Sequence, residues 1–339
     1  MQSIPSIEPT HRRRTARVVA ACLALAGAAL GPGREAAGAQ AYPDRPLRLL
    51  VPFPPGGSQD IAARLLAAPV AQALGENVVV DNRAGSGGLI AAREAARAQP
   101  DGYTLLMASG AQMGIAPAMH EKVGYDPVKS FVHVIHLTDT PMALIAHPQL
   151  PVAGVKELVA YSLAHRGKLN TASTGTGTYT HLTIELLKQI TGADLTHVPY
   201  KGAAPAINDL LGRQVQTMVT STASAQPHTS TGRLKGIAVA APKRSRAMPE
   251  VATFAEQGVA GLEVSVWLGI AVPAGVSRAV VDRLAKEFAA ALTLPEVRER
   301  LDQLGAEVNG ATGDPFARMV RADVERWRKV VRAANVKIE

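Results

Sequence analysis

The stretch Val51-Pro52-Phe53-Pro54-Pro55-Gly56-Gly57-Ser58-Gln59-Asp60 decides how the rest of the chain is interpreted. It follows an apolar run at residues 47–51 that predicts a buried strand, and it precedes a pattern that predicts a helix over residues 58–74. Prolines stiffen the loop, two glycines let the backbone turn, and Ser58 is the expected N-cap. The free N–H groups at such a helix start suit an anion, typically a phosphate or a carboxylate. The alternative is an ordinary strand-to-helix loop without a ligand.

This loop matches neither of the common nucleotide-binding signatures. No Gly-Lys-Ser/Thr follows the glycines, and their spacing is not that of a GxGxxG loop. Nucleotide chemistry is therefore disfavoured.

Length and composition limit the possible classes of protein. A chain of 339 residues is long enough for two ordinary domains or one large one. Aromatic residues make up only 4%, which argues against a base-stacking nucleic-acid binder and against an aromatic-lined sugar cleft. We therefore expect no nucleic-acid partner.

The formal charge of +8 comes partly from the N-terminal segment. Residues 1–41 hold five arginines and two glutamates, so the rest has 36 − 5 = 31 basic and 28 − 2 = 26 acidic residues, a net +5. These charges are interspersed, and the one tight basic cluster, residues 243–246, is typical of a solvated face. A mildly positive surface still favours the capture of acidic solutes.

The first 41 residues have the three parts of a secretory signal peptide. A basic region at residues 11–17 leads into an apolar run at residues 18–30, and an Ala39-Gln40-Ala41 sequence predicts cleavage near Ala41. The run is too short for a membrane-spanning helix, so a membrane anchor is the less favoured alternative. Cys22, the one cysteine, would leave with this segment, so the mature chain would have no thiol and no disulfide.

After residue 42 the chain alternates short apolar runs with helical patterns, which predicts an α/β fold built from βαβ units around a mostly parallel sheet. A proline at position 69 predicts a kink or restart in the first helix. Strands are expected over residues 47–51, 77–80, 103–108, 142–146, 168–172, 215–221, 234–240 and 264–271. Helices are expected over residues 58–74, 89–98, 155–165, 181–190, 206–211, 278–292, 295–304 and 314–334.

Four glycine-rich or hydroxyl-rich segments follow predicted strands and open predicted helices. Besides the first loop they are residues 81–88, residues 170–181 and residues 197–205, and Ser109-Gly110 ends another strand. Ligands of parallel α/β sheets sit beyond the carboxyl ends of the strands, where these segments would gather. They offer neutral donors and N–H groups without a fixed cation.

Single side chains in these loops have two interpretations each. His181 can donate to a ligand carboxylate or cap its own helix, and Lys201 can place a charge in the cleft or face solvent. Asp60 is expected to stabilise the helix start or tie loops together, and Tyr179 and Phe53 to wall the pocket or to pack. The sequence lacks HExxH, GxSxG, metal-ligand clusters and paired carboxylates, which favours binding without catalysis, metal or cofactor.

An ordered series of motifs resembles one known family. The motifs are VPFPPGG from Val51, DNRAGSGG from Asp81, PDGYTL from Pro100, YDP from Tyr125, GTG from Gly175, HL at His181, HVPYKG from His197 and RW at Arg326. Together they resemble the substrate-binding receptors of tripartite tricarboxylate transporters, the Bug or TctC-like family. The resemblance covers nearly everything from Tyr42 to Glu339.

The resemblance implies a periplasmic binding-protein fold, in which two α/β lobes close like a hinge on a ligand between them. The expected lobes are residues 42–141 plus 267–339, with the C-terminal helices on the first lobe, and residues 142–266. It also implies a periplasmic monomer without a cofactor that binds a small carboxylate and docks on membrane permease subunits. Ligand contacts, largely through backbone N–H groups and water, are expected from Phe53, Pro54, Gly56, Gly57, Ser58, Asp60, Ser109, Thr174, Gly175, Thr176, Gly177, Thr178, Tyr179, His181, Tyr200, Lys201, Gly202 and Ala203.

Three departures from the family pattern bear on the ligand. Ala116 stands where Asn is usual, Gln216 where Asp is usual, and Tyr179 where Ser or Pro is more common. A lost carboxylate and an added phenol near the cleft suggest a larger or aromatic acid. Two other functions stay open: a receptor that presents its solute to a membrane sensor kinase, and an enzyme acting on small anions with His181 as its base.

Overall fold

The computed structural model describes residues 1–3, 42–120 and 122–336. The chain divides into two compact units, Met1–Asp44 and Arg45–Glu339, and the features below belong to the second. The predicted signal peptide, its cleavage site and Cys22 lie outside the described residues. No described helix has both the length and the hydropathy needed to cross a membrane.

The first sheet has the strand order β2-β1-β3-β9-β4, and β10 adds to β4. β1 runs parallel to β2 and β3, whereas β9 is antiparallel to both β3 and β4. The strands are β1 (Leu47–Val51), β2 (Val78–Asn82), β3 (Thr104–Ser109), β4 (Phe131–Ala146), β9 (Ser265–Pro273) and β10 (Glu307–Val308).

The second sheet uses the other end of β4. Residues 142–146 pair antiparallel with β7 (Thr217–Ser221) and β8 (Lys235–Ala240), and β5 (Asn170–Ser173) lies parallel between β7 and β6 (Thr196–Pro199). Pro141 is the last β4 residue paired with β9, and Met142 is the first paired with β7 and β8. β4 therefore passes from one sheet into the other.

The expectation of a mostly parallel sheet is wrong. Each βαβ unit is parallel, but every pairing of β4 and of β9 is antiparallel. The first part of β4 was not predicted because two bulges, near His133 and His136, interrupt its alternation and because it carries polar residues. Only its apolar end, residues 142–146, reads as a strand.

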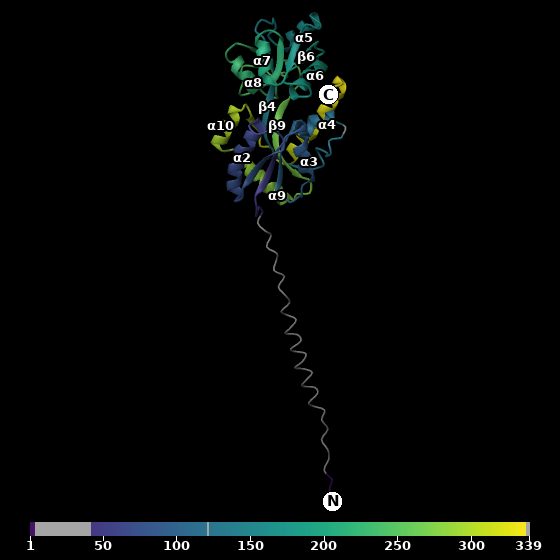
Figure 1. Cartoon of the computed structure of the whole chain (residues 1–339), viewed down its shortest axis with the longest axis vertical. Helices are drawn as coiled ribbons and strands as arrows, with labels where there is room; N and C mark the ends of the chain where they lie inside the picture. The colour runs from purple at the N-terminus through teal and green to yellow at the C-terminus, as the bar shows by residue number, and fades with distance from the viewer. Residues whose placement is uncertain (4–41, 121, 337–339) are drawn as a thin grey trace. The chain divides into compact units, whose positions relative to one another are not determined.

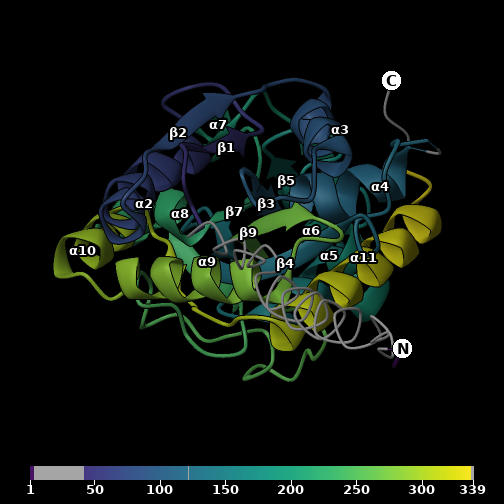
Figure 2. The ribbon, with the colours of Figure 1, turned by 90° about the horizontal axis from the view of Figure 1, so that it is seen from below.

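Helices cover the sheets, with α2 and α3 beside the first sheet and α5 to α8 beside the second (Figure 1). In Figure 2, α9 and α11 lie on the side of the molecule where β4 lies, and both contact β4. The helical segments are α2 (Ser58–Leu74), η1 (Ser86–Gly88), α3 (Leu89–Arg97), η2 (Ala111–Ile115), α4 (Ala116–Met119), α5 (Val155–Ala164), α6 (Tyr179–Thr191), α7 (Ala203–Leu211), α8 (Thr222–Thr229), α9 (Arg278–Ala291), α10 (Pro295–Gln303) and α11 (Asp314–Ala334).

Helix α2 continues through Pro69, with Leu66 and Val70 buried on either side, so the chain does not restart a helix there. The expectation that Ser58 is the N-cap is wrong. Ser58 is the first helical residue, and the N-cap is Gly57, which has no side chain to bond with. The Asp60 carboxylate accepts a hydrogen bond from the nearby Gly56 N–H instead.

Helix α8 was not predicted because its sequence, TASAQPHT, has no apolar stripe and contains a proline.

Helix α11 joins the cores under the two sheets. Its first half contributes Phe316, Val320 and Val324 to the core around β3 and β9. Its second half contributes Trp327, Val330 and Val331 to the core around α5 and α6. The C-terminal helix therefore packs against elements of both sheets, and not on the first alone.

Candidate functional site

The Asp60 carboxylate holds the first glycine loop in place through hydrogen bonds. This side chain is 3% exposed and accepts hydrogen bonds from Gly56 N–H at 2.9 Å, Asn82 Nδ2 at 3.0 Å and Arg64 Nε at 3.0 Å. The hydrogen bond from Arg64 is the main cause that keeps the pKa of Asp60 below its ordinary value. Asn82 also donates to the Phe53 carbonyl at 3.0 Å, so the loop is fixed at both ends. Asp60 therefore ties loops together, as its position predicted.

The exposed part of this loop presents backbone donors. Pro54, Gly56, Gly57 and Ser58 are exposed, and Gly56 needs its glycine because its φ is +83°. No described residue accepts a hydrogen bond from the N–H groups of Ser58, Gln59 or Asp60, the first three of α2. These groups, at the positive end of the helix dipole, suit an anion.

Ser109 links the first loop to the end of β3. Its hydroxyl accepts from Gln59 Nε2 at 3.2 Å and donates to Gln112 Oε1. Gln112 Nε2 in turn donates to the Met107 carbonyl at 2.9 Å. Ser109 is fully buried, and its hydroxyl is already engaged in these hydrogen bonds. It therefore positions the loop and does not face a ligand.

The second loop, residues 174–178, is held by its own hydroxyl groups. Thr180 Oγ1 accepts from Thr174 N–H at 2.9 Å, and Thr178 Oγ1 donates to the Gly175 carbonyl at 2.7 Å. Thr178 is also the N-cap of α6. Thr176 is exposed at the tip. The N–H groups of Thr176, Tyr179 and Thr180 have no acceptor in the part of the chain that the structure describes.

Two stacked histidines lie under this second loop. The rings of His181 and His197 are 3.8 Å apart and inclined by 8°, and Ser173 Oγ is 2.7 Å from His197 Nε2. Gly177 N–H donates to His181 Nδ1 at 3.1 Å, so this nitrogen carries no proton. Burial lowers the pKa of both rings, that of His197 to about 4, with a further contribution from His181. His181 is therefore a neutral support of the loop.

The third segment approaches the second loop through its backbone. Gly175 has a φ of +138°, and a Cβ there would lie 3.4 Å from the Tyr200 carbonyl. The Tyr200 hydroxyl donates to Asp209 at 2.7 Å, so it is not aimed at a ligand. Burial, followed by this bond, raises the pKa of Tyr200 to about 12. Gly202 and Ala203 open α7, and Lys201 is exposed.

Tyr179 brings the two loops to the same place in the fold. It is the first residue of α6, and a Cβ built on Gly110 would lie 1.8 Å from its hydroxyl oxygen. Gly110 directly follows Ser109, which holds the first loop through Gln59. The loops after β1 and β5 therefore converge on the end of β3. Tyr179 itself is 7% exposed and packs edge-on against Trp327, so it does not wall an open pocket.

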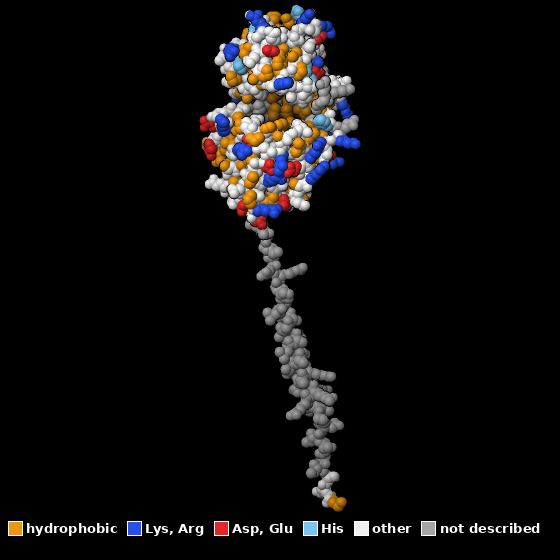
Figure 3. Space-filling model, viewed as in Figure 1, with side chains coloured by type: hydrophobic (Ala, Val, Ile, Leu, Met, Phe, Trp, Pro, Cys, Tyr) orange, Lys and Arg blue, Asp and Glu red, His pale blue; other side chains and the backbone are white. Residues whose placement is uncertain are grey.

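The surface between the two sheets is hollowed. Figure 3 shows a recess at the level of β4 and β9, with hydrophobic side chains on its floor. Among the described residues there is no group of three or more His, Cys, Asp or Glu side chains that would hold a metal ion. The convergent loops offer N–H groups and hydroxyls, which fits an anion bound without a metal.

Sequence reasoning missed several supporting residues. These residues, Asn82, Gln59 and Gln112, fix the first loop. Asn82 had a signal, because it lies in a motif at the end of β2. The others act through contacts between distant segments and left no local pattern.

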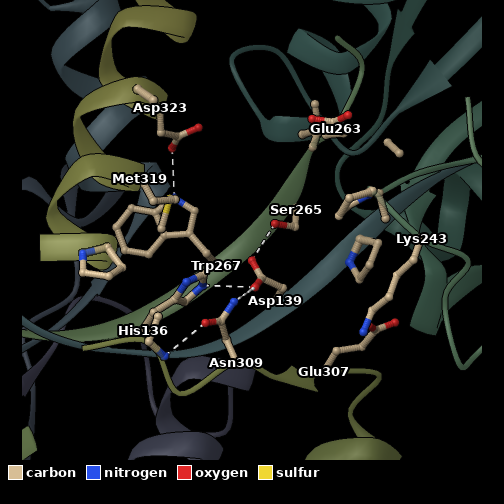
Figure 4. A pocket seen from close by; sticks show the side chains of 18 of the residues that line it. His136, Asp139, Lys243, Glu263, Ser265, Trp267, Glu307, Asn309, Met319 and Asp323 are labelled. Atoms are coloured by element: carbon tan, nitrogen blue, oxygen red, sulfur yellow. Dashed lines mark hydrogen bonds and ion pairs between the residues drawn. The ribbon is translucent and has the colours of Figure 1, made fainter. Parts of the chain in front are cut away.

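A separate cavity of about 460 Å³ lies where β4 passes between the sheets. Figure 4 shows its polar centre, in which Asp139 accepts from Ser265 Oγ at 2.7 Å and from Asn309 Nδ2 at 2.9 Å. His136 Nε2 lies 3.2 Å from the same carboxylate. None of the predicted site residues lines this cavity.

Residues 62–336 match the profile of the tripartite tricarboxylate transporter family receptor. The chain belongs to this receptor family. It is 34% identical to the protein BugT of Bordetella pertussis over 302 residues, which are 89% of this chain and 93% of that protein.

Two solved structures from Rhodopseudomonas palustris are similar to this receptor. One is a protein with adipate, at 33% identity and a TM-score of 0.71, covering 87% of this chain and 99% of that one. The other is MatC with bound malate, at 34% identity and a TM-score of 0.68, covering 86% and 100%. These likenesses confirm the predicted periplasmic binding-protein fold, and they identify a periplasmic solute-binding receptor that is not an enzyme.

Proposed function

We propose that this receptor binds a small aliphatic dicarboxylate between its two sheets and delivers it to the membrane subunits of a tripartite tricarboxylate-type transporter. One carboxylate meets the free N–H groups at the start of α2, and the other meets those at the start of α6. The observation that carries the proposal is the convergence of both loops on Ser109 and Gly110.

The chemistry of the loops supports a carboxylate. Each loop is held by its own hydrogen bonds, so its donors are fixed before a ligand arrives, and a preorganised site loses less free energy on binding. The two solved relatives contain malate and adipate, which are both dicarboxylates.

The structure gives no support to the expected preference for an aromatic acid. Tyr179 is buried against Trp327, and Gln216 uses its side chain to accept Asn170 N–H at 2.9 Å. Ala116 is buried at the start of α4. Because the side chains at these three positions make contacts inside the protein, we propose that the ligand is an aliphatic acid and not an aromatic one.

Hinged closure is part of the proposal. β4 changes partners at Pro141 and Met142, and we propose this point as the boundary between the predicted lobes, residues 42–141 plus 267–339 and residues 142–266. Rotation at this point would bring the starts of α2 and α6 together on the ligand. Export by the N-terminal segment and docking of the closed form on permease subunits complete the proposed cycle.

A thermal-shift panel on the chain from Tyr42 to Glu339 tests the binding step. The panel contains acetate, succinate, malate, adipate, citrate, glutamate and benzoate, each up to millimolar concentration. A ligand at one hundred times its dissociation constant adds about 2.7 kcal/mol of stability. A shift confined to four- to six-carbon dicarboxylates is expected. Stabilisation by benzoate alone would contradict the aliphatic class, and no shift, with no co-purified acid found by mass spectrometry, would contradict carboxylate binding.

A further inference from the structure

A buried polar cluster joins the second loop to helix α11 through Tyr179, which is buried and does not line an open pocket. We propose that Tyr179 and Asp323 are positioning residues, and that the Tyr179 hydroxyl donates to the Asp323 carboxylate when the ligand draws the two loops together. This pair then holds the closed form. The inference rests on the proposed function.

The geometry places the Tyr179 hydroxyl oxygen and the Asp323 carboxylate oxygen close together. From one point, a Cβ built on Gly110, the Tyr179 hydroxyl oxygen is 1.8 Å away and Asp323 Oδ2 is 2.7 Å away. These two distances put the oxygens at most 1.8 + 2.7 = 4.5 Å apart. Because an O–H···O bond to a carboxylate needs about 2.5–2.7 Å, a small movement of either element would form it.

Forming this hydrogen bond would lower the free energy of the Tyr179 hydroxyl. Tyr179 is buried, and no described residue accepts a hydrogen bond from its hydroxyl. Asp323 is 6% exposed, and Trp267 Nε1 donates to its Oδ2 at 2.9 Å, as Figure 4 shows. A buried donor without an acceptor costs free energy, and a carboxylate oxygen can accept more than one bond. The proposed closure would give this donor an acceptor.

Asp323 lies where α11 passes from one hydrophobic core to the other, so a movement between the two proposed lobes would change its surroundings. Val324 next to it belongs to the core under the first sheet, and Trp327, one turn later, belongs to the core around α6. Tyr179 packs on Trp327, with ring centres 5.6 Å apart. Because Gly110 has no side chain, the hydroxyl can enter this contact, and an alanine there would collide with it.

The charges around Asp323 set how the pair depends on pH. Arg326 on α11 favours the carboxylate, and Asp139 on β4, which is paired with His136, opposes it. Lys243, Glu263 and Glu307 line the same cavity, and the buried Tyr179 hydroxyl of α6 faces the group. Burial is the main cause that raises the pKa of Asp323 to about 6. Above that pH the ionised oxygen is the stronger acceptor, so the closed form is favoured.

The chain carries its own reporters of this contact. Its two tryptophans, Trp267 and Trp327, both belong to the cluster. Ionisation of Asp323 beside the Trp267 indole, and movement of Tyr179 on Trp327, should both change tryptophan emission. No label is needed.

The test compares Tyr179→Phe and Asp323→Asn with the matched controls Tyr161→Phe and Asp314→Asn, using malate and adipate as ligands. Tyr161 is on α5 and stacks on His165, and Asp314 is exposed at the other end of α11. Calorimetry at pH 7.5 should show affinity about tenfold weaker for each cluster variant, no further loss in the double variant, and wild-type affinity for the controls. Wild-type affinity should fall below pH 6, and that of Asp323→Asn should not.

The outcomes separate this inference from the proposed function. Suppose that the wild type binds a dicarboxylate, and that folded Tyr179→Phe binds it equally with the same change in tryptophan emission. The proposed Tyr179–Asp323 pair is then overturned, and the proposed function stands. If the double variant shows the summed loss of the two single variants, the residues act separately and the pair is also overturned. If the wild type, free of any co-purified acid, binds no dicarboxylate of the thermal-shift panel, the proposed function fails and the proposed Tyr179–Asp323 pair fails with it.

Discussion

At the scale of single residues, the side chains that looked available for a ligand are mostly engaged by the protein. Asp60, Ser109, Tyr200 and His181 each make a hydrogen bond that shapes a loop. What remains free at both loops is the backbone N–H. Recognition by backbone groups explains how a site without a fixed cation can still suit a carboxylate.

Replacing Asp60 by Ala should destabilise the receptor by about 2–3 kcal/mol, because Gly56 N–H and Asn82 Nδ2 lose a buried charged acceptor. Urea unfolding at pH 7.5 measures the change. The control is Asp282→Ala, which removes an exposed ion pair to Arg278 and should cost less than about 1 kcal/mol. Equal effects of the two variants would show that Asp60 does not brace the loop.

The buried His133 should make the receptor sensitive to acid. Burial lowers the pKa of His133 to about 4. The unfolded chain takes up the proton near pH 6.5 and the folded chain only near 4. Stability should therefore fall as pH drops from 6.5 to 4, by up to about 3 kcal/mol from this residue.

Stability measured by urea unfolding across this pH range checks the expectation. His133→Leu removes the titrating ring and keeps an apolar contact with Phe316. Its stability should fall less steeply between pH 6.5 and 4. A slope identical to that of the wild type would rule out His133 as a source of the acid sensitivity.

At the scale of elements, the starts of α2 and α6 carry the binding argument. Their loops were predictable because glycines, prolines and hydroxyls after an apolar run mark a helix start. The contacts that join them were not, because Gln59 to Ser109 and Tyr179 to Gly110 link segments far apart in sequence. Local pattern predicts the loops, and only the fold shows that they meet.

Ser58→Pro tests the role of the α2 N–H groups directly. Position 58 is the first helical residue, and Gly57 before it has φ −74° and ψ 163°, which a following proline tolerates. The variant should stay folded, lose one free N–H and weaken dicarboxylate binding about tenfold in calorimetry, a typical loss for a hydrogen bond to a charged group.

Two controls isolate the N–H from the hydroxyl and from the proline. Ser58→Ala keeps the N–H and should bind like the wild type, if the ligand uses the backbone. Arg278→Pro places a proline at the same position of α9, after Ser277 with φ −61° and ψ 146°, and should leave binding unchanged. A full loss of binding in Ser58→Ala would shift the contact to the hydroxyl and contradict backbone recognition.

At the scale of the whole molecule, two segments connect the sheets. β4 changes partners at Pro141 and Met142, and α11 changes cores between Val324 and Trp327. The α/β alternation and the end of β4 could be predicted from periodicity. The antiparallel crossing could not, because its bulges and polar residues hide the strand, and pairing between strands far apart in the sequence leaves no periodic pattern.

The most direct test of the central claim is a crystal structure of the chain from Tyr42 with the acid that stabilises it most. The account predicts one carboxylate about 2.7–3.2 Å from N–H groups at the start of α2, and the other at the same distance from those at the start of α6. An acid bound only in the cavity beside Asp139 and Ser265, or held by side chains of one sheet alone, would contradict it.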